Sequence, residues 1–519
     1  MKLVTGTEMR ALEQRAFAAG ATPEGLMANA GHAIADALHE PLGGIPARRI
    51  VVLVGPGNNG GDGLVAAKHL SDFGAEVIVY LVAPRSEADP NLQQVRTRDI
   101  EVIRLDGTTD SAYDEAIARA DAVIDAVLGT GSLRPLEGAA AAALDGLKNR
   151  RGLLFAIDLP SGVNADTGEA DPHAPRADVT LTLGLAKTGL YTWPGSSLAG
   201  EVEVLDIGLD ASFAAEVKTE LLTEQWAREH LPERPGESNK GSYGRALIVA
   251  GCDRYLGAAT LASLGALRSG AGLGMVAAVA SVRAAVASNL PEVTYLPLPE
   301  SEGALDASAG DVIARALPGN DVLLMGPGLS TASGVQSVIR GLLTSEVVEE
   351  VPLVLDADAL NCLARFPGWH ERVKAKAVLT PHPGELARVA NLTVAEVQSS
   401  RLPTAQRLAQ EWHQTVVLKG AHTVVAAPDG TTFVSPFANA ALATAGTGDV
   451  LAGAIAGLIA QGIEPSTAAG LGVYLHGAAA EEYAADYGAS GMLASELARG
   501  IAVVAAALRR QREKRLAAL

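Results

Sequence analysis

The stretch 445–449 (Ala-Gly-Thr-Gly-Asp) joins two glycines to a carboxylate at the start of an apolar run. The run 450–460 is typical of a buried helix, so the glycines place backbone N–H groups at the helix N-terminus. These donors and the helix dipole favour an anion such as phosphate. Asp449 then lies where a base is needed if a hydroxyl group is to attack that phosphate, which makes it a candidate catalytic residue.

Three further motifs precede this stretch in the second half of the chain. Residues 419–423 (Lys-Gly-Ala-His-Thr) could hold the phosphate or adenosine part of a nucleotide, although alone they suit a hairpin turn. His382 and Glu385 follow an apolar strand and could present an imidazole and a carboxylate to a ligand. Asp356 and Asp358 could help to place a metal ion or could simply cap a helix. No Walker-type glycine-lysine motif is present, which argues against a P-loop.

The first half carries oxygen-bearing side chains at the ends of three predicted strands. In a doubly wound sheet these strand ends converge, so the side chains are expected to lie close together. Oxygen atoms without sulfur or a histidine pair favour a hard cation such as potassium, sodium or magnesium over zinc. The alternative is that the same residues only make turns and caps. The residues are Asn58, Asn59, Asp62, Asp125, Asp158 and Ser161.

Apolar strands and helical stretches alternate along both halves, which predicts an α/β fold with ligands at the carboxyl ends of the strands. Thr7 is the predicted N-cap of a helix over 8–19, and Thr22 is the predicted N-cap of a second helix that continues to about Leu38. The strands are expected at 49–55, 75–82, 101–105, 122–128, 153–158, 178–184 and 201–207, and then at 245–250, 275–280, 292–298, 322–326, 352–356, 377–380, 415–418, 423–427 and 432–434.

The segment 211–242 interrupts this alternation with prolines, glycines and mixed charges. With 519 residues, the chain exceeds one ordinary hydrophobic core. We therefore predict one domain over 1–215 and another over 243–519. Residues 216–242 are predicted to be a linker that leads into the second domain.

The net charge of −18 argues against nucleic acid or an anionic membrane as a partner. Only two cysteines are present, so no disulfide framework is expected and a reducing compartment is favoured. The N-terminus shows no signal peptide, and the longest apolar run, 450–460, is too short to span a bilayer. We expect a cytoplasmic protein.

The motifs together point to a family. Residues 243–499 resemble the dehydratase branch of the ribokinase-like superfamily, and residues 1–210 resemble the epimerase domain often fused ahead of it. The whole chain is therefore similar to the bifunctional enzymes that repair hydrated nicotinamide cofactors. The matching segments are 251–258, 267–273, 326–328, 356–358, 381–385, 419–420 and 445–449 in the second half, and 26–31, 55–63, 125–131 and 158–162 in the first.

For the first domain, the resemblance implies a Rossmann-like doubly wound sheet that interconverts the R and S epimers of NAD(P)HX. This substrate is NAD(P)H with a hydroxyl group on C6 of its reduced ring. Potassium would bind Asn59, Asp125 and Ser161. We expect Asp158 to handle the proton near the hydrated ring, with Asp62 as the alternative. The implied substrate-binding residues are Asn58, Asn59, Gly60, Gly61, Asp62, Gly129, Thr130, Gly131, Ser132, Leu133, Arg134, Pro135 and Asp158.

For the second domain, the resemblance implies a ribokinase-like α/β/α fold that converts the hydroxyl group of the S epimer into a phosphate ester. ADP would be the donor, giving AMP and phosphate, and elimination would restore NAD(P)H. Asp449 would accept the hydroxyl proton, magnesium would bridge the phosphates of the donor, and the chain would form a homo-oligomer. The implied NAD(P)HX-binding residues are Ala258, Gly328, His382 and Asp449, and the implied AMP-binding residues are Lys419, Gly420, Ala421, His422, Thr423 and Gly448.

Two other functions remain open from the sequence. One is a small-molecule kinase of the same superfamily, whose active loop would look alike. In that case the first half would be a non-catalytic ligand-binding module. A hydride-transferring oxidoreductase is least favoured, because the loop 55–63 lacks the Gly-x-Gly-x-x-Gly spacing of dinucleotide-binding proteins. The sequence leaves open ADP versus ATP, NADHX versus NADPHX, and the number of subunits.

Overall fold

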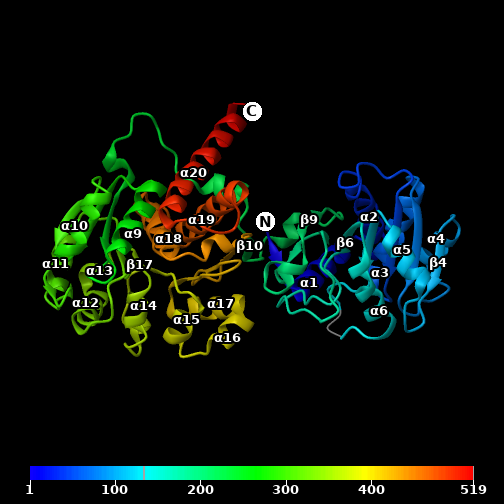
Figure 1. Cartoon of the computed structure of the whole chain (residues 1–519), viewed down its shortest axis with the longest axis horizontal. Helices are drawn as coiled ribbons and strands as arrows, with labels where there is room; N and C mark the ends of the chain where they lie inside the picture. Colours follow the sequence, from blue (N-terminus) through cyan, green and yellow to red (C-terminus); the bar gives the residue numbers. More distant parts are fainter. Residues whose placement is uncertain (132–134, 518–519) are drawn as a thin grey trace. The chain divides into compact units, whose positions relative to one another are not determined.

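The computed structural model describes residues 1–131 and 135–517, and it divides into two compact units (Figure 1). The first unit is Lys2–Val217, and the second is Lys218–Leu519 together with Met1. Each unit is built on a large, mostly parallel sheet with helices between the strands. The predicted α/β fold class is confirmed for both halves.

The first unit contains seven parallel strands in the order β4-β3-β2-β5-β6-β7-β9. The order reverses between β2 and β5, and at such a switch point the loops after the two strands diverge and leave a crevice for ligands. The strands are β2 (Arg49–Val54), β3 (Glu76–Leu81), β4 (Glu101–Arg104), β5 (Ala122–Ala126), β6 (Leu153–Ile157), β7 (Val179–Leu183) and β9 (Glu201–Leu205), and a separate parallel pair joins β1 (Leu3–Val4) to β8 (Ala186–Lys187).

Both faces of this sheet are buried, because successive residues of a strand point to opposite faces. Ile50, Val52 and Val54 of β2 belong to one apolar cluster, which includes residues of α2 and α3, whereas Val51 and Leu53 belong to another, which includes residues of α5 and α6. The helices are α1 (Gly6–Ala18), α2 (Pro23–Ala37), α3 (Asn58–Asp72), α4 (Pro90–Arg96), α5 (Ser111–Arg119), α6 (Gly138–Gly146) and α7 (Gly195–Leu198).

The second unit contains a ten-stranded sheet in the order β10-β21-β20-β19-β18-β17-β16-β11-β12-β13. Its pairs are parallel except those that β20 makes with β19 and β21. A switch point lies between β11 and β16. The strands are β10 (Thr219–Leu221), β11 (Arg245–Val249), β12 (Leu273–Ala278), β13 (Thr294–Pro297), β16 (Val322–Met325), β17 (Leu353–Leu355), β18 (Ala377–Leu379), β19 (Thr415–Leu418), β20 (Val424–Ala426) and β21 (Thr432–Val434), with a small hairpin of β14 (Glu300–Ser301) and β15 (Ala304–Leu305).

Helix α18 is the buried helix expected from the apolar run, and it packs against α9, α19 and strands β11, β16 and β17. Its contact with α9 is made by main chain, because a Cβ atom on Gly453 would lie 2.0 Å from the carbonyl oxygen of Ala262 and one on Gly265 would lie 2.2 Å from that of Val450. The helices of this unit are α8 (Glu224–His230), α9 (Leu256–Ser269), α10 (Ala280–Asn289), α11 (Ala309–Ala316), α12 (Ser333–Leu343), α13 (Glu346–Glu349), α14 (Asp358–Leu363), α15 (Pro383–Ala390), α16 (Val394–Ser399), α17 (Arg401–Trp412), α18 (Thr447–Ala460), α19 (Pro465–Tyr487) and α20 (Ala494–Ala517).

One local expectation from the sequence is wrong. The first helix is capped by Thr5 rather than Thr7, because Thr5 and Glu8 form a capping box: the Thr5 hydroxyl accepts from the Glu8 N–H at 3.1 Å and the Glu8 carboxylate accepts from the Thr5 N–H at 2.8 Å. The segment 216–242, predicted as a linker that leads into the second domain, contains α8 and the edge strand β10, which pairs in parallel with β21.

Within residues 1–131 and 135–517, every helix is too short or too polar to cross a bilayer.

Candidate active sites

The predicted glycine loop of the first unit becomes the start of α3, directly after β2. A Cβ atom on Gly60 would lie 2.2 Å from the carbonyl oxygen of Gly55, so only glycine allows the helix to begin this close to the strand. Arg85 holds the loop from the other side, where its Nη1 donates to the carbonyl oxygens of Gly55 (2.8 Å) and Gly57 (3.1 Å). Residues 58–62 therefore present the N-terminal N–H groups of α3 at the switch point, where an anionic group can bind.

Of the three predicted potassium ligands, Asp125 lies in β5 and Ser161 follows β6, whereas Asn59 lies at the start of α3. Ser161 donates to Asp125 from its hydroxyl group (2.6 Å) and from its backbone N–H (2.8 Å), and its Oγ accepts from the Leu128 N–H at 2.7 Å. Asn59 borders the same loop, since a Cβ atom on Gly129 would lie 3.2 Å from its side chain.

The polar atoms of this group are incompletely satisfied, which suits a bound ion or ligand. Asp125 is fully buried, burial raises its pKa, and no cationic side chain of the described residues pairs with it. The Asn59 Nδ2 atom is also buried and lacks a hydrogen-bond partner among the described residues. Gly129, Thr130, Gly131 and Pro135 lie in the loop between β5 and α6, whereas the predicted residues Ser132, Leu133 and Arg134 lie outside the described residues.

Asp158 ends β6 in a left-handed conformation (φ +67°) and forms an ion pair with Lys187 of β8. The ammonium group of Lys187 is 1 % exposed and also donates to Thr182 Oγ1 (3.3 Å) and to the Leu183 carbonyl oxygen (2.9 Å). Asp62 and Glu13 complete the charged group, because each interacts electrostatically with Asp158 and Lys187. Burial, Asp158 and Glu13 raise the pKa of Asp62 well above its ordinary value.

The second site is centred on the start of α18. Gly446 is the N-cap in a left-handed conformation (φ +88°), and a Cβ atom there would lie 2.4 Å from Leu261 Cδ1 of α9. His476 of α19 donates from Nε2 to the Thr447 carbonyl oxygen at 3.0 Å, which fixes the first turn. Asp449 lies in that turn, and burial, followed by the charge of Asp356, raises its pKa to about 7.

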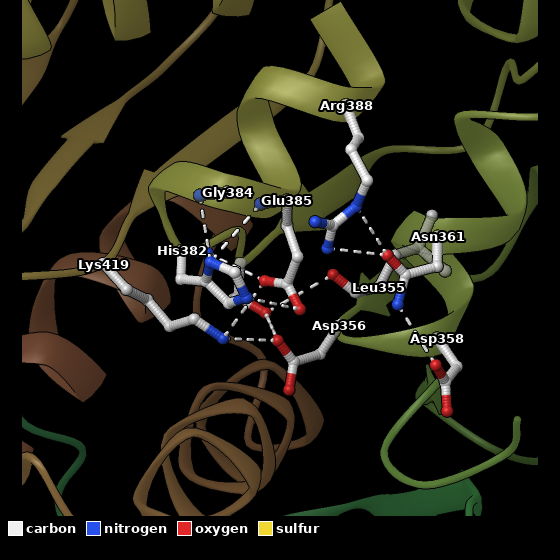
Figure 2. A network of polar contacts seen from close by, with 10 residues as sticks. Leu355, Asp356, Asp358, Asn361, His382, Gly384, Glu385, Arg388 and Lys419 are labelled. Atoms are coloured by element: carbon white, nitrogen blue, oxygen red, sulfur yellow. Dashed lines mark hydrogen bonds and ion pairs between the residues drawn. The ribbon is translucent and has the colours of Figure 1, made fainter. Parts of the chain in front are cut away.

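Lys419 links this helix start to two carboxylates (Figure 2). Its Nζ lies 2.8 Å from Asp356 Oδ1 and 3.8 Å from Glu385 Oε2, and a Cβ atom on Gly448 would lie 3.3 Å from it. Burial opposes the charge of Lys419, but the two carboxylates more than offset this effect and raise its pKa. The ammonium group therefore stays charged beside Asp449, where it can contact a phosphoryl group.

His382 is the N-cap of α15 and points its imidazole toward the same cluster (Figure 2). Its Nδ1 accepts from the N–H groups of Gly384 (3.0 Å) and Glu385 (3.3 Å), so a neutral ring carries its proton on Nε2. Burial is the first cause that lowers the pKa of His382. With a neutral ring, His382 can donate a hydrogen bond from Nε2, and its side chain is half exposed, so a ligand could reach it.

Ala258 and Gly328 lie against each other at the second switch point. A Cβ atom on Gly328 (φ +63°) would lie 2.8 Å from Ala258 Cβ and 2.7 Å from Tyr255 Cβ. Gly326 packs as closely on the next loop, where a Cβ atom would lie 1.8 Å from the carbonyl oxygen of Asp356. The loops after β11, β16 and β17 are therefore packed main chain on main chain, which brings Ala258 and Gly328 to the Asp356 side of the cluster.

The remaining predicted nucleotide-binding residues follow β19. Gly420 (φ +137°) lies over Arg401, whose Nη2 donates to the carbonyl oxygens of Leu418 (3.1 Å) and Lys419 (3.2 Å). His422 is buried, with Nδ1 3.0 Å from the Ser435 carbonyl oxygen. Ala421 and Thr423 flank it in the same loop, and Thr423 Oγ1 donates to the Gly420 carbonyl oxygen at 2.9 Å.

Comparison with known proteins covers both sites. Residues 23–189 match the family described as YjeF-related protein N-terminus, and residues 246–502 match the family described as NAD(P)H-hydrate dehydratase. The bifunctional NAD(P)H-hydrate repair enzyme Nnr of Moorella thermoacetica is 41 % identical over 507 residues, which are 96 % of this chain and 95 % of that protein. The chain belongs to the family of bifunctional NAD(P)H-hydrate repair enzymes.

Other members of the family are also similar over most of their length. The Escherichia coli enzyme is 35 % identical over 87 % of this chain and 84 % of its own. A crystal structure of the ADP/ATP-dependent NAD(P)H-hydrate dehydratase from Bacillus subtilis, co-crystallized with ATP and Mg²⁺, is 36 % identical. It covers 56 % of this chain and 98 % of that chain, with a TM-score of 0.48. The resemblance drawn from the motifs is confirmed at the level of the family.

Sequence reasoning missed four polar residues of these sites. Lys187 and Glu13 lie next to Asp158 in the first unit. Arg85 donates to carbonyl oxygens of the loop after β2, and Arg401 donates to those of the loop after β19. None of them lies in a glycine-rich motif. Only the burial of Lys187 in the run Leu-Gly-Leu-Ala-Lys (183–187) gave a signal, since a lysine within apolar residues needs a partner.

Proposed function

We propose that this chain repairs hydrated nicotinamide cofactors, with NAD(P)HX epimerase activity in residues 1–215 and ADP-dependent dehydratase activity in residues 243–519. The observation that carries the dehydratase assignment is the half-buried Asp449 at the glycine-built start of α18, next to the charged Lys419. A carboxylate with a pKa near neutrality can take a proton from a hydroxyl group and release it again.

The dehydration proceeds in two balanced steps. Asp449 removes the proton of the C6 hydroxyl group while its oxygen attacks the β-phosphorus of ADP and AMP leaves. The new C6 phosphate ester then eliminates: the C6–O bond breaks, the departing phosphate takes a proton from the neighbouring ring carbon, and the double bond of NAD(P)H is restored. The N–H groups of α18 and the ammonium group of Lys419 stabilise the charge on the transferring phosphoryl group.

The donor sets fit the expected cations in different ways. Mg²⁺ commonly uses one or two carboxylates together with substrate phosphates, and no group of three protein ligands exists among the described residues, so Asp356 and Glu385 would hold it jointly with ADP. When bound, it neutralises charge on the phosphates. Potassium would be held by oxygen atoms of Asn59, Asp125 and Ser161, where the fully buried Asp125 carboxylate lacks a cationic partner among the described residues.

The epimerase residues bind and orient the substrate. The start of α3 (58–62) would hold a phosphate of NAD(P)HX, residues 129–135 would bind the substrate, and Asp158 would handle the proton near the hydrated ring. Both cysteines are free and buried, which suits a reducing cytoplasm. Assembly into a homo-oligomer is expected and is measured by light scattering.

The test incubates the full chain with mixed R- and S-NADHX and either ADP or ATP. The expected result is recovery of the near-ultraviolet absorbance of reduced nicotinamide, with AMP and phosphate as products of ADP. All of the substrate should be consumed, since the R epimer is converted to S. A stable phosphorylated product would instead select the kinase, and half-consumption of the mixture would show that the first unit does not epimerise.

Dehydration is expected to speed up as pH rises through about 7, the pKa of Asp449. The folded-state pKa is raised, so the base is protonated and inactive below pH 7 and ionised above it. The measurement is kcat at saturating ADP and S-NADHX between pH 5.5 and pH 8.5, in buffers of equal ionic strength. A rate that is flat across pH 6 to 8 would contradict the base role.

Arg401→Met is expected to raise the KM for ADP about tenfold with little change in kcat. The substitution removes donors to the carbonyl oxygens of Leu418 and Lys419, each of which contributes about 1 kcal/mol to holding the loop. Arg407→Met, on an exposed position of the same helix, is the matched control. An unchanged KM would show that the loop keeps its shape without this arginine.

A further inference from the structure

Four ionisable side chains from four elements meet in the first unit: Glu13 of α1, Asp62 of α3, Asp158 after β6 and Lys187 of β8. Asp62 and Asp158 are each less than a tenth exposed, and Lys187 is fully buried. Three carboxylates therefore share one ammonium group in a region with little water. Such a group cannot carry all three negative charges at neutral pH without a large electrostatic penalty, so its protons are distributed unequally.

Lys187 contacts only one side of the Asp158 carboxylate. Oδ1 of Asp158 accepts from Lys187 Nζ, from Thr182 Oγ1 at 3.4 Å and from the Leu183 N–H at 3.3 Å. No donor from the part of the chain that the structure describes reaches Oδ2. The backbone conformation is held as well, because the Asp158 N–H donates to the Leu181 carbonyl oxygen at 2.8 Å despite the positive φ.

Asp62 has the opposite environment. Its burial and the nearby negative charges of Asp158 and Glu13 raise its pKa, and the opposing effects of Lys187 and Arg85 are smaller. Glu13 is half-buried, and its pKa is also raised mainly by burial. One carboxylate of the group is thus locked in an ion pair, while its buried neighbour retains a proton.

We propose that Lys187 is the positioning residue of the epimerase: it fixes Asp158 as the carboxylate that accepts a proton through Oδ2, so that Asp62 acts as the carboxylic acid that donates one. This assignment rests on the proposed epimerase function. It divides acid and base work between two carboxylates by giving them different neighbours, which is a general route to paired acid–base catalysis.

The step balances without another reactant. Asp62 gives its proton to the C6 hydroxyl group, the C6–O bond breaks, water leaves, and the ring nitrogen shares its electron pair with C6 to form an iminium cation. Water then adds to the other face of C6 and loses a proton to Asp158. One proton has moved from Asp62 to Asp158, and the reverse reaction, or exchange with solvent, returns it.

The experiment measures R-to-S exchange of NADHX by the full chain across pH 5 to 9 in wild type and in Lys187→Met. The variant is expected to exchange about 100-fold more slowly at pH 7, with the loss in kcat rather than in KM, because the Asp158 carboxylate is no longer held in place by its ion-pair partner. Lys148→Met, at a lysine that is 76 % exposed in the same unit, is the matched control and should follow the wild type.

Asp62→Asn is the second variant, because Lys187→Met could lower exchange simply by unfolding the unit. It should lower exchange about 100-fold and remove the alkaline limb, which in the wild type reports loss of the Asp62 proton. Retained circular dichroism, together with an unchanged chemical denaturation of the first unit, shows that a variant is folded. Wild-type exchange in Lys187→Met, a loss carried by KM alone in that variant, or an alkaline limb retained in Asp62→Asn, overturns the proposal. Absence of exchange in the wild type overturns the epimerase function itself.

Discussion

Asp449→Asn is expected to lower the kcat of dehydration about 10³-fold while the KM for ADP changes little. An amide cannot accept the hydroxyl proton, and a positioned base contributes about 10²- to 10⁴-fold to such a reaction. The fold should tolerate the change, because asparagine is nearly isosteric and the first turn of α18 is held by other contacts, those of Gly446 and His476. The measurement is the initial rate of recovery of reduced nicotinamide from S-NADHX.

Asp486→Asn is the matched control, because this aspartate is exposed at the end of α19. It should leave kcat unchanged. The pH profile gives a second check, since the residual rate of Asp449→Asn should no longer rise through pH 7. Near-normal turnover in Asp449→Asn would eliminate the base role and with it the proposed route through a phosphate ester.

Asp158→Asn is expected to lower epimerisation about 10³-fold and to lower the free energy of unfolding of the first unit by about 3 kcal/mol. The activity is lost with the proton acceptor. The stability is lost because Lys187 becomes a fully buried ammonium group without its carboxylate partner. The two effects are measured separately, by epimer exchange and by chemical denaturation.

The double variant Asp158→Asn/Lys187→Met separates these effects. It removes the buried charge as well as its partner, so most of the lost stability should return while epimerisation stays low. Asp145→Asn, at a half-exposed position of α6, is the control for an aspartate outside the site. Full epimerase activity in Asp158→Asn would transfer the proton-handling role to Asp62.

The sequence predicts the parts of this protein that depend on local pattern. Buried parallel strands appear in the sequence as continuous apolar runs, which predicted most of the strands. The start of α18 appears as glycines followed by an apolar run, which predicted the helix. The strand β10 was not identified, because three residues in a segment rich in turns show no periodicity, and its pairing with β21 joins residues about two hundred positions apart.

Side-chain partners were harder to predict than strands. Lys187 comes 29 residues after Asp158 in the sequence. Their ion pair follows only from the placement of β8 beside the end of β7. His422 shows the opposite case: it belongs to a loop expected to bind a nucleotide, yet its ring bonds Ser435 in the interior.

The close contact between α9 and α18, made at glycines, fixes the distance between these two helices. The two helices run in parallel, with Gly453 against Ala262 and Gly457 against Ala266, and their first turns carry Ala258 and Asp449. Because main chain touches main chain, no side chain is available to compress or rotate, so the span between the pocket for the hydrated ring and the phosphate-binding turn is constant. A methyl group at Gly453 or Gly457 would push the two helices apart and so lengthen that span, although neither glycine lies in the first turn of α18.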